Sequence, residues 1–238
     1  MLFRSVADAN SQPAQQDGAL SGVYALLYLD AEKIAPAARW AKTALKLNPD
    51  SVDGLVVDGT LLTMQTRFEQ ARGQFEHALQ LAPDTGRAWL GLATLALLAR
   101  DLAQANQLIE RSLRTMSAHV GTWHLLGWTQ LAAQDLGGAE ETFQHALQMD
   151  RNFAETHGAL AAIAALRGDR PAAERGIEVA ERLDSQCLST QLARAILLAG
   201  GGKASQAQQL IEQTLTTLGG ADSSALSGML IPKRRKPR

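Results

Sequence analysis

The sequence has few residues of several types, and each of these shortages excludes some classes of fold. Its single cysteine, Cys187, excludes an internal disulfide and provides no spacing for a cysteine-ligated metal. Only seven prolines and two tyrosines occur, and β-branched and aromatic residues never alternate with polar ones, which argues against strands. No apolar run reaches the ~18 residues that a membrane-spanning helix needs. What remains is an alanine- and leucine-rich chain, 46% apolar, which favours helices throughout.

The net charge is also small: it is −1 for the 238 residues, so the chain as a whole is not a polyanion binder. The basic residues are concentrated at the end of the sequence, which leaves the rest acidic. We interpret this tail either as a solvated segment or as an electrostatic handle for an anionic membrane or nucleic acid. The residues of this basic tail are Lys233, Arg234, Arg235, Lys236 and Arg238.

A 34-residue period runs through the chain. Alanines recur at this spacing without a gap, and a large apolar residue follows four positions after most of them, as in Ala71 with Phe75 and Ala139 with Phe143. Such a period is typical of a solenoid built from two-helix repeats. Six repeats tile residues 18 to about 221. The aligned alanines are Ala37, Ala71, Ala105, Ala139, Ala173 and Ala207.

The third repeat illustrates the two predicted helices. Residues 87–99 form the first, residues 102–116 the second, and residues 100–101 the turn between them. The small and the large residue lie one helical turn apart on one face, so the alanine admits the partner helix closely and the large side chain fills the space above it.

At this level the sequence resembles the tetratricopeptide-repeat family. The motifs that carry the resemblance are Trp89-x2-Leu92-Ala93, Trp123-x2-Leu126-Gly127, Ala71-x3-Phe75-x2-Ala78 with Pro83, and Ala139-x3-Phe143-x2-Ala146. The resemblance implies an all-α, right-handed α-solenoid of about six helix-turn-helix repeats over residues 18–221. Residues 1–17 are then an N-terminal segment, incomplete or artefactual, and residues 222–238 are a C-terminal tail. Asp58 and Arg194 depart from the pattern at leucine positions, where we expect a paired or locally exposed charge.

Catalytic and metal-binding patterns are missing. The five histidines have no metal-ligand spacing, and the "GGGK" of residues 200–203 lacks the residues of a phosphate loop. We expect His77 and His145, 68 residues apart, to face outward and His157 to be a satisfied interior side chain. The prediction is therefore no enzyme, no cofactor, no metal and no small-molecule substrate.

The resemblance also implies a concave groove lined by the first helix of each repeat. Here that wall is largely apolar and lacks the lysine and asparagine with which some family members clamp a terminal carboxylate. We expect it to bind the apolar face of a helix or an extended hydrophobic segment. Leu97, Leu98, Trp128 and Leu131 would anchor the ligand and Arg87 would orient it. The predicted groove residues are Val56, Thr60, Met64, Arg87, Leu90, Thr94, Leu97, Leu98, His124, Trp128, Leu131, Glu155 and Ala162.

The predicted function is a protein-protein interaction scaffold or adaptor that binds a protein or peptide partner, of a bacterial assembly or secretion-related kind. Two alternatives stay open: a recruiting or regulatory fragment of a larger enzyme, and a membrane- or nucleic-acid-associated factor acting through the basic tail. The groove would be filled internally if residues 223–232 folded back onto it. The chain as written predicts a cytoplasmic protein, and a periplasmic or envelope location would follow if the true N-terminus lies upstream.

Overall fold

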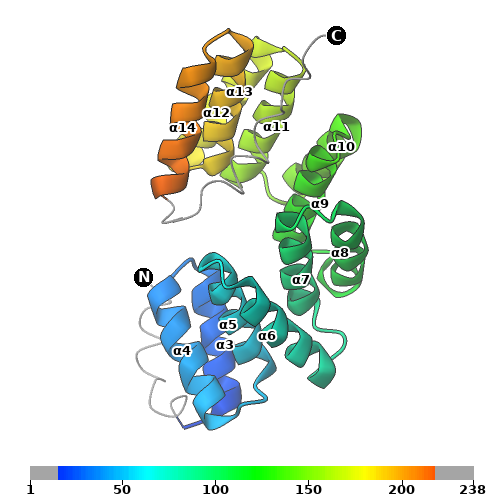
Figure 1. The fold of residues 1–238 in the computed structure, drawn as a ribbon, viewed down its shortest axis with the longest axis vertical. Helices are drawn as coiled ribbons and strands as arrows, with labels where there is room; N and C mark the ends of the chain where they lie inside the picture. Colours follow the sequence, from blue (N-terminus) through cyan, green and yellow to red (C-terminus); the bar gives the residue numbers. More distant parts are fainter. Residues whose placement is uncertain (1–15, 218–238) are drawn as a thin grey trace. The chain divides into compact units, whose positions relative to one another are not determined.

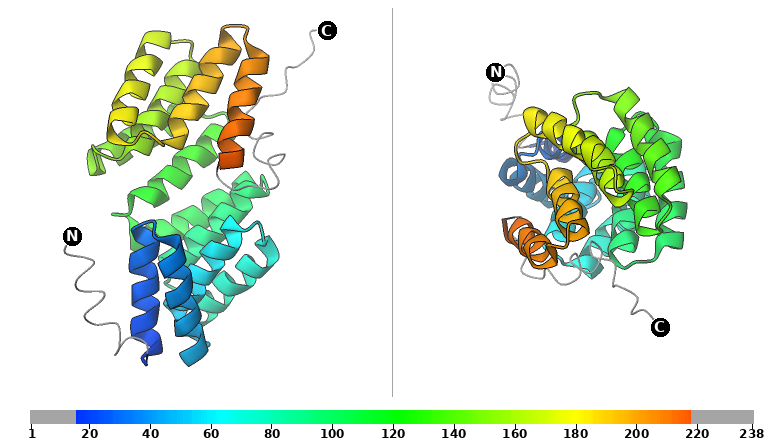
Figure 2. Two further views of the ribbon diagram at one scale, coloured as in Figure 1. Left: turned by 90° about the vertical axis from the view of Figure 1, so that its left-hand side faces the viewer. Right: turned by 90° about the horizontal axis from the view of Figure 1, so that it is seen from above.

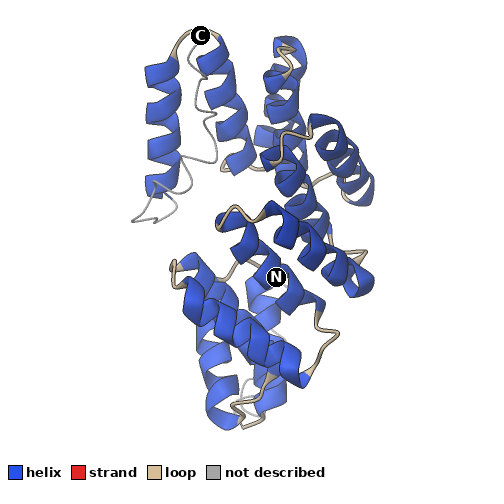
Figure 3. Cartoon of the chain, turned by 45° about the vertical axis from the view of Figure 1, so that its right-hand side comes forward, coloured by secondary structure: helices blue, strands red, loops and turns tan. Residues whose placement is uncertain are grey.

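The computed structural model describes residues 16–217, and within them it contains twelve α-helices and no strands (Figures 1 and 3). The predicted all-α solenoid of helix-turn-helix repeats is thus confirmed. The basic tail and nearly all of the N-terminal segment lie outside the described residues. In the described part of the chain, every helix is too short or too polar to cross a bilayer.

The chain divides into two compact units, residues 1–117 and 118–238, which are treated separately below. Each holds three helical hairpins of the predicted kind, and the antiparallel pairs are visible in Figure 2. The helices of the first unit are α3 (Gly18–Asp30), α4 (Ile34–Leu47), α5 (Val52–Met64), α6 (Phe68–Leu81), α7 (Gly86–Leu98) and α8 (Leu102–Met116). Those of the second unit are α9 (Val120–Ala132), α10 (Leu136–Met149), α11 (Ala154–Leu166), α12 (Arg170–Leu183), α13 (Leu188–Gly200) and α14 (Ala204–Thr217).

Each hairpin turn depends on one residue with left-handed backbone. These residues have φ between 56° and 80° and recur every 34 positions. Left-handed backbone is unfavourable for residues other than glycine, yet only the last two turns use glycine. The repeat geometry therefore fixes the turn even where the residue type opposes it. The six residues are Glu32, Thr66, Arg100, Gln134, Gly168 and Gly202.

Three of the second helices, α8, α10 and α12, begin at an aspartate whose side chain caps them. The carboxylates of Asp101, Asp135 and Asp169 each accept the backbone N–H three residues later, at 2.9–3.0 Å. Such caps satisfy N–H groups that the first helical turn leaves without a partner.

The predicted small-large contact forms the core. Ala71 and Phe75 are 0% and 1% exposed, and Ala139 and Phe143 are both fully buried. The Phe75 ring lies so close to α7 that a Cβ atom on Gly91 would approach it to 2.3 Å. A glycine is therefore needed where the helix axis and the ring come together, and a core aromatic holds consecutive repeats of the first unit in register.

Candidate functional site: the faces of the first helices

The first helices of the first unit, α3, α5 and α7, pack side by side in chain order. We define the first-helix face of this unit as the residues at the predicted groove positions that are not buried. On this face Met64 is 60% exposed, and the other members are partly exposed. Its members are Thr60, Met64, Arg87, Leu90, Thr94, Leu97 and Leu98.

The polar groups of this face are already satisfied. The Thr60 hydroxyl donates to the Val56 carbonyl and the Thr94 hydroxyl to the Leu90 carbonyl, both at 2.9 Å. Their methyl groups therefore add to the apolar surface of the three leucines and Met64. The prediction for Val56 was wrong in one respect, because its side chain is only 2% exposed and belongs to the core cluster under the face.

A forked ion pair lies at the edge of the first-helix face. Both terminal nitrogens of Arg87 donate to the carboxylate of Asp30 at 2.8 Å, which links the start of α7 to the end of α3. Burial raises the pKa of Asp53, and the nearby charge of Arg87 opposes that rise. Arg87 was predicted to orient a ligand, but its guanidinium is already held by the protein's own carboxylate.

The equivalent positions of the second unit are used differently. His124 is 7% exposed, and its Nε2 lies 2.7 Å from the Thr156 hydroxyl of the next repeat. The rings of Phe143 and Phe153 contact its edge, with centroids 5.2 and 4.9 Å away. Burial lowers the pKa of His124 to about 4, with the charge of Glu155 opposing the shift, so the ring is neutral at pH 7. The expectation of a groove-lining histidine was wrong, because His124 is a core side chain.

Apolar members of the predicted groove are also taken up by packing in this unit. Ala162 is fully buried in a cluster with Ile177 and Ala193, so it was wrongly predicted to contact a partner. Trp128 and Leu131 are partly buried against Phe143 and Ile163. Of the predicted groove residues in this unit, His124 and Ala162 are therefore buried, and Trp128 and Leu131 are partly covered by the core cluster.

Glu155 has a structural partner within the unit. Its carboxylate accepts the backbone N–H groups of Leu188 and Ser189 at 2.8 and 3.1 Å, and also the Ser189 hydroxyl. It thereby caps the start of α13 from the preceding repeat, a favourable place for a negative charge. Nearby Cys187 is buried, and burial together with Glu155 raises the pKa of its thiol to about 12. A capping carboxylate, rather than a ligand-binding one, explains this residue.

The structure also explains the two charged residues, Asp58 and Arg194, that stand where the family pattern has leucine. Arg194 forms a fork with Glu181 at 2.8–3.1 Å and is exposed, as expected for a paired charge. Asp58 is half-buried, which raises its pKa, and Arg67 and a hydrogen bond from Gln74 oppose that shift.

The two similar histidines differ in their contacts. His77 Nε2 lies 2.9 Å from the Asp50 carboxylate, whereas the exposed His145 contacts the Trp123 ring at 4.3 Å between centroids. His157 Nε2 lies 2.9 Å from the Arg151 carbonyl, so its ring is satisfied as predicted, but the side chain is partly exposed and not interior.

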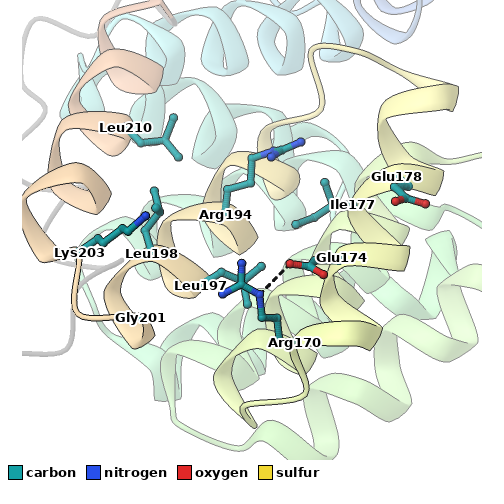
Figure 4. A pocket seen from close by; sticks show the side chains of 10 residues that line it. All are labelled: Arg170, Glu174, Ile177, Glu178, Arg194, Leu197, Leu198, Gly201, Lys203 and Leu210. Atoms are coloured by element: carbon teal, nitrogen blue, oxygen red, sulfur yellow. Dashed lines mark hydrogen bonds and ion pairs between the residues drawn. The ribbon is translucent and has the colours of Figure 1, made fainter.

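A cavity of about 620 Å³ opens between α12, α13 and α14 (Figure 4). Ile177, Leu197, Leu198 and Leu210 contribute apolar side chains to it, and charged side chains, Lys203 among them, complete the lining. In the described residues, no cluster of histidine, cysteine and carboxylate side chains could hold a metal ion.

Comparison with known proteins shows which family model and which solved structures this architecture resembles. The family model described as tetratricopeptide repeat matches residues 120–153, the fourth repeat. No curated protein matches the chain. These features define a helical-repeat solenoid. The described residues thus have the fold of tetratricopeptide-repeat (TPR) structures, and residues 120–153 match the TPR model itself.

Several solved structures share the fold. A chain of the APC/C hetero-tetramer Cut9-Hcn1 aligns with a TM-score of 0.68 and 17% identity, over 96% of this chain and 45% of that one. The present chain thus spans less than half of that relative. PilF of Pseudomonas aeruginosa gives 0.59 and 15%, over 89% and 95%. YrrB, described as a TPR protein with an unusual peptide-binding site, gives 0.50 and 16%, over 82% and 100%.

Proposed function

We propose that the protein is an adaptor that binds an apolar segment of a partner protein on the first-helix face of its first unit. The observation that carries the proposal is the apolar surface made by Met64, Leu90, Leu97 and Leu98 on α5 and α7. Exposed apolar surface of this kind on a monomer usually marks an interaction site.

The chemistry of the face favours an apolar partner over a charged one. The two threonine hydroxyls are bonded to backbone carbonyls, and Arg87 is bonded to Asp30. A charged ligand would have to displace these partners before it gained new ones. An amphipathic helix or an extended hydrophobic segment would instead gain by covering the side chains that are left in water.

The structural neighbours support this kind of role. One of them assembles within a hetero-tetramer and another is described as having a peptide-binding site. The finer part of the proposal is a bacterial assembly or secretion-related setting, and the likeness to PilF of Pseudomonas aeruginosa agrees with its bacterial part.

Affinity capture from native lysate, followed by titration with the purified partner, tests the proposal. The baits are the wild type, Met64→Asp/Leu97→Asp, and the control Leu81→Asp, which changes a leucine that is 42% exposed on α6. Circular dichroism first establishes that all three are folded. We expect a partner that is retained by the wild type and the control and lost by the double variant, with nearly salt-independent affinity. Identical binding by all three baits would reject the proposal.

A further inference from the structure

Asp53 lies on the same side of α5 as two members of the first-helix face. Thr60 and Met64 follow it by seven and eleven residues, and this spacing places the three side chains along one side of the helix. Arg87, another member of the face, holds the same repeat position on α7, 34 residues later. Asp53 therefore adds a carboxylate to the face at the start of α5, while Met64 lies at the end of that helix.

The carboxylate of Asp53 is half-buried and has no partner within its unit. The residues that the structure describes provide it with neither a hydrogen bond nor an ion pair. Helix α3 runs close beside it, since a Cβ atom on Gly22 would lie 3.0 Å from the Asp53 Cβ. Burial raises the pKa of Asp53, and Arg87, whose charge opposes the rise, is itself forked to Asp30. A carboxylate partly removed from water without a partner is unfavourable, so a cation brought to it would be favoured.

Glu155 holds the same repeat position in the second unit and shows what a partnered carboxylate does there. It accepts the N–H groups of Leu188 and Ser189 at the start of the next first helix. In the first unit, Asp53 accepts no such bond from the start of α7. An aspartate side chain is one methylene shorter than that of a glutamate, which agrees with this difference. Asp53, unlike Glu155, is therefore not used within its own unit.

The charges at this edge of the face also favour a cation. Two acidic side chains, Asp30 and Asp53, and one basic side chain, Arg87, leave the group with an excess of one negative charge. A carboxylate of a partner would meet two like charges and a guanidinium that is already paired. A lysine or arginine would bring the group to neutrality, and complementary charge of this kind contributes mainly to specificity.

We propose that Asp53 binds a lysine or arginine of the partner and so selects, among apolar segments, those that carry one basic residue. The inference rests on the proposed function, because it assigns the chemistry of the segment bound on that same face. One cation leaves the rest of the contact apolar, so the affinity stays only weakly dependent on salt.

The position of Asp53 also sets the spacing within the segment. Asp53 and Met64 are eleven residues apart on one helix, which corresponds to about 16 Å. The basic residue of the partner and the apolar side chain that covers Met64 must span this distance. That takes about five residues of extended chain or about eleven residues of helix.

Selection from a displayed library of random peptides, each long enough to span this distance, tests the inference. The targets are the full chain as wild type, Asp53→Lys, Met64→Asp and the control Glu76→Lys, which makes the same charge change at an exposed position of α6. Circular dichroism first establishes that each target is folded. The affinity of the peptide most enriched on the wild type is then measured on the wild type and on Asp53→Asn, with the basic residue of the peptide retained or replaced by glutamine.

We expect the wild type and Glu76→Lys to enrich apolar peptides with a lysine or arginine at the predicted spacing. Asp53→Lys should enrich apolar peptides with an acidic residue at that place, and Met64→Asp should lose the apolar peptides. Neutralising either Asp53 or the basic residue of the peptide should weaken binding about fivefold or more, and neutralising both should weaken it no further.

The outcomes separate this inference from the proposed function. Apolar peptides that depend on Met64 but carry no basic residue, or that keep it on Asp53→Lys, would overturn the inference and leave the proposed function standing. Loss of the basic residue on Glu76→Lys as well would overturn it as an effect of net charge alone. Peptides that bind Met64→Asp as well as the wild type, or a library that yields no binders, would overturn both.

Discussion

The first and second units are built from the same repeat but use the first-helix positions in different ways. In the first unit, Met64 is 60% exposed and the leucines of α7 stay partly exposed. In the second unit, His124 and Ala162 are buried and Glu155 caps the next helix. The difference teaches that the repeat fixes where a side chain is placed, while the size and polarity of its neighbours decide whether it remains available to a partner.

The largest effect on stability is expected when a core aromatic residue is replaced by alanine. Phe75→Ala and Phe143→Ala should each cost about 3–5 kcal/mol, because both side chains are fully buried and leave a cavity. Since contacts in an array are between neighbours, each loss should be confined to its own unit. Amide hydrogen exchange, measured for the separate peptides of each unit, shows where protection is lost. A uniform loss of protection over both units from either substitution would show that the units unfold together.

The next largest effect is expected from acid, which should change the stability of the two units in opposite directions. His124 titrates near 6.5 when unfolded and near 4 when folded, so the unfolded state binds more protons between these values. The second unit should therefore lose up to about 3 kcal/mol as pH falls from about 6.5 to 4, with little further change from this group below 4.

The first unit should respond in the opposite sense through Asp53 and Asp58. Their folded pKa values are raised, so the folded state takes up protons first and is stabilised as pH falls. Urea unfolding followed by hydrogen exchange at several pH values checks both trends. His124→Gln is the control that should remove the loss in the second unit, and an equal acid response of the variant would contradict the assignment.

Replacing two glycines of the first unit by alanine should change its stability in opposite directions. Gly91→Ala forces a Cβ against the Phe75 ring and should destabilise by about 1–3 kcal/mol. Gly73 in α6 has open space around it, so Gly73→Ala should stabilise by about 0.5–1 kcal/mol through helix propensity alone. Urea melts of both variants test this, and a neutral Gly91→Ala would mean that the ring has room to move.

The smallest effect on stability is expected from substitutions in the hairpin turns. Thr66 has a φ of 60°, whereas Gly168 holds the same repeat position in the second unit. Thr66→Gly should stabilise the first unit by up to ~1 kcal/mol, because it removes steric strain that exceeds the added freedom of the unfolded chain. The reverse change, Gly168→Thr, should destabilise the second unit by a similar amount. Thermal melts of the pair compare them, and the same sign for both would disprove the strain argument.

Much of the fold could be predicted from the sequence, because it depends on local patterns that repeat. The third repeat was predicted as helices over residues 87–99 and 102–116, and the structure has α7 at Gly86–Leu98 and α8 at Leu102–Met116. The candidate site could be predicted only in part. Position in the repeat indicates the side of a helix, but not that His124 meets Thr156 32 residues away or that Glu155 finds the start of α13. Such contacts depend on the packing of successive repeats, which one repeat does not reveal.

Binding of the partner by position-matched variants tests the central claim most directly. Met64 and Leu166 hold the same repeat position, and both are exposed, at 60% and 40%. The affinity of the captured partner should be measured by calorimetry for the wild type, Met64→Asp and Leu166→Asp. The account predicts a large loss for Met64→Asp and wild-type affinity for Leu166→Asp. Equal losses for the two variants, or an unchanged affinity for Met64→Asp, would contradict it.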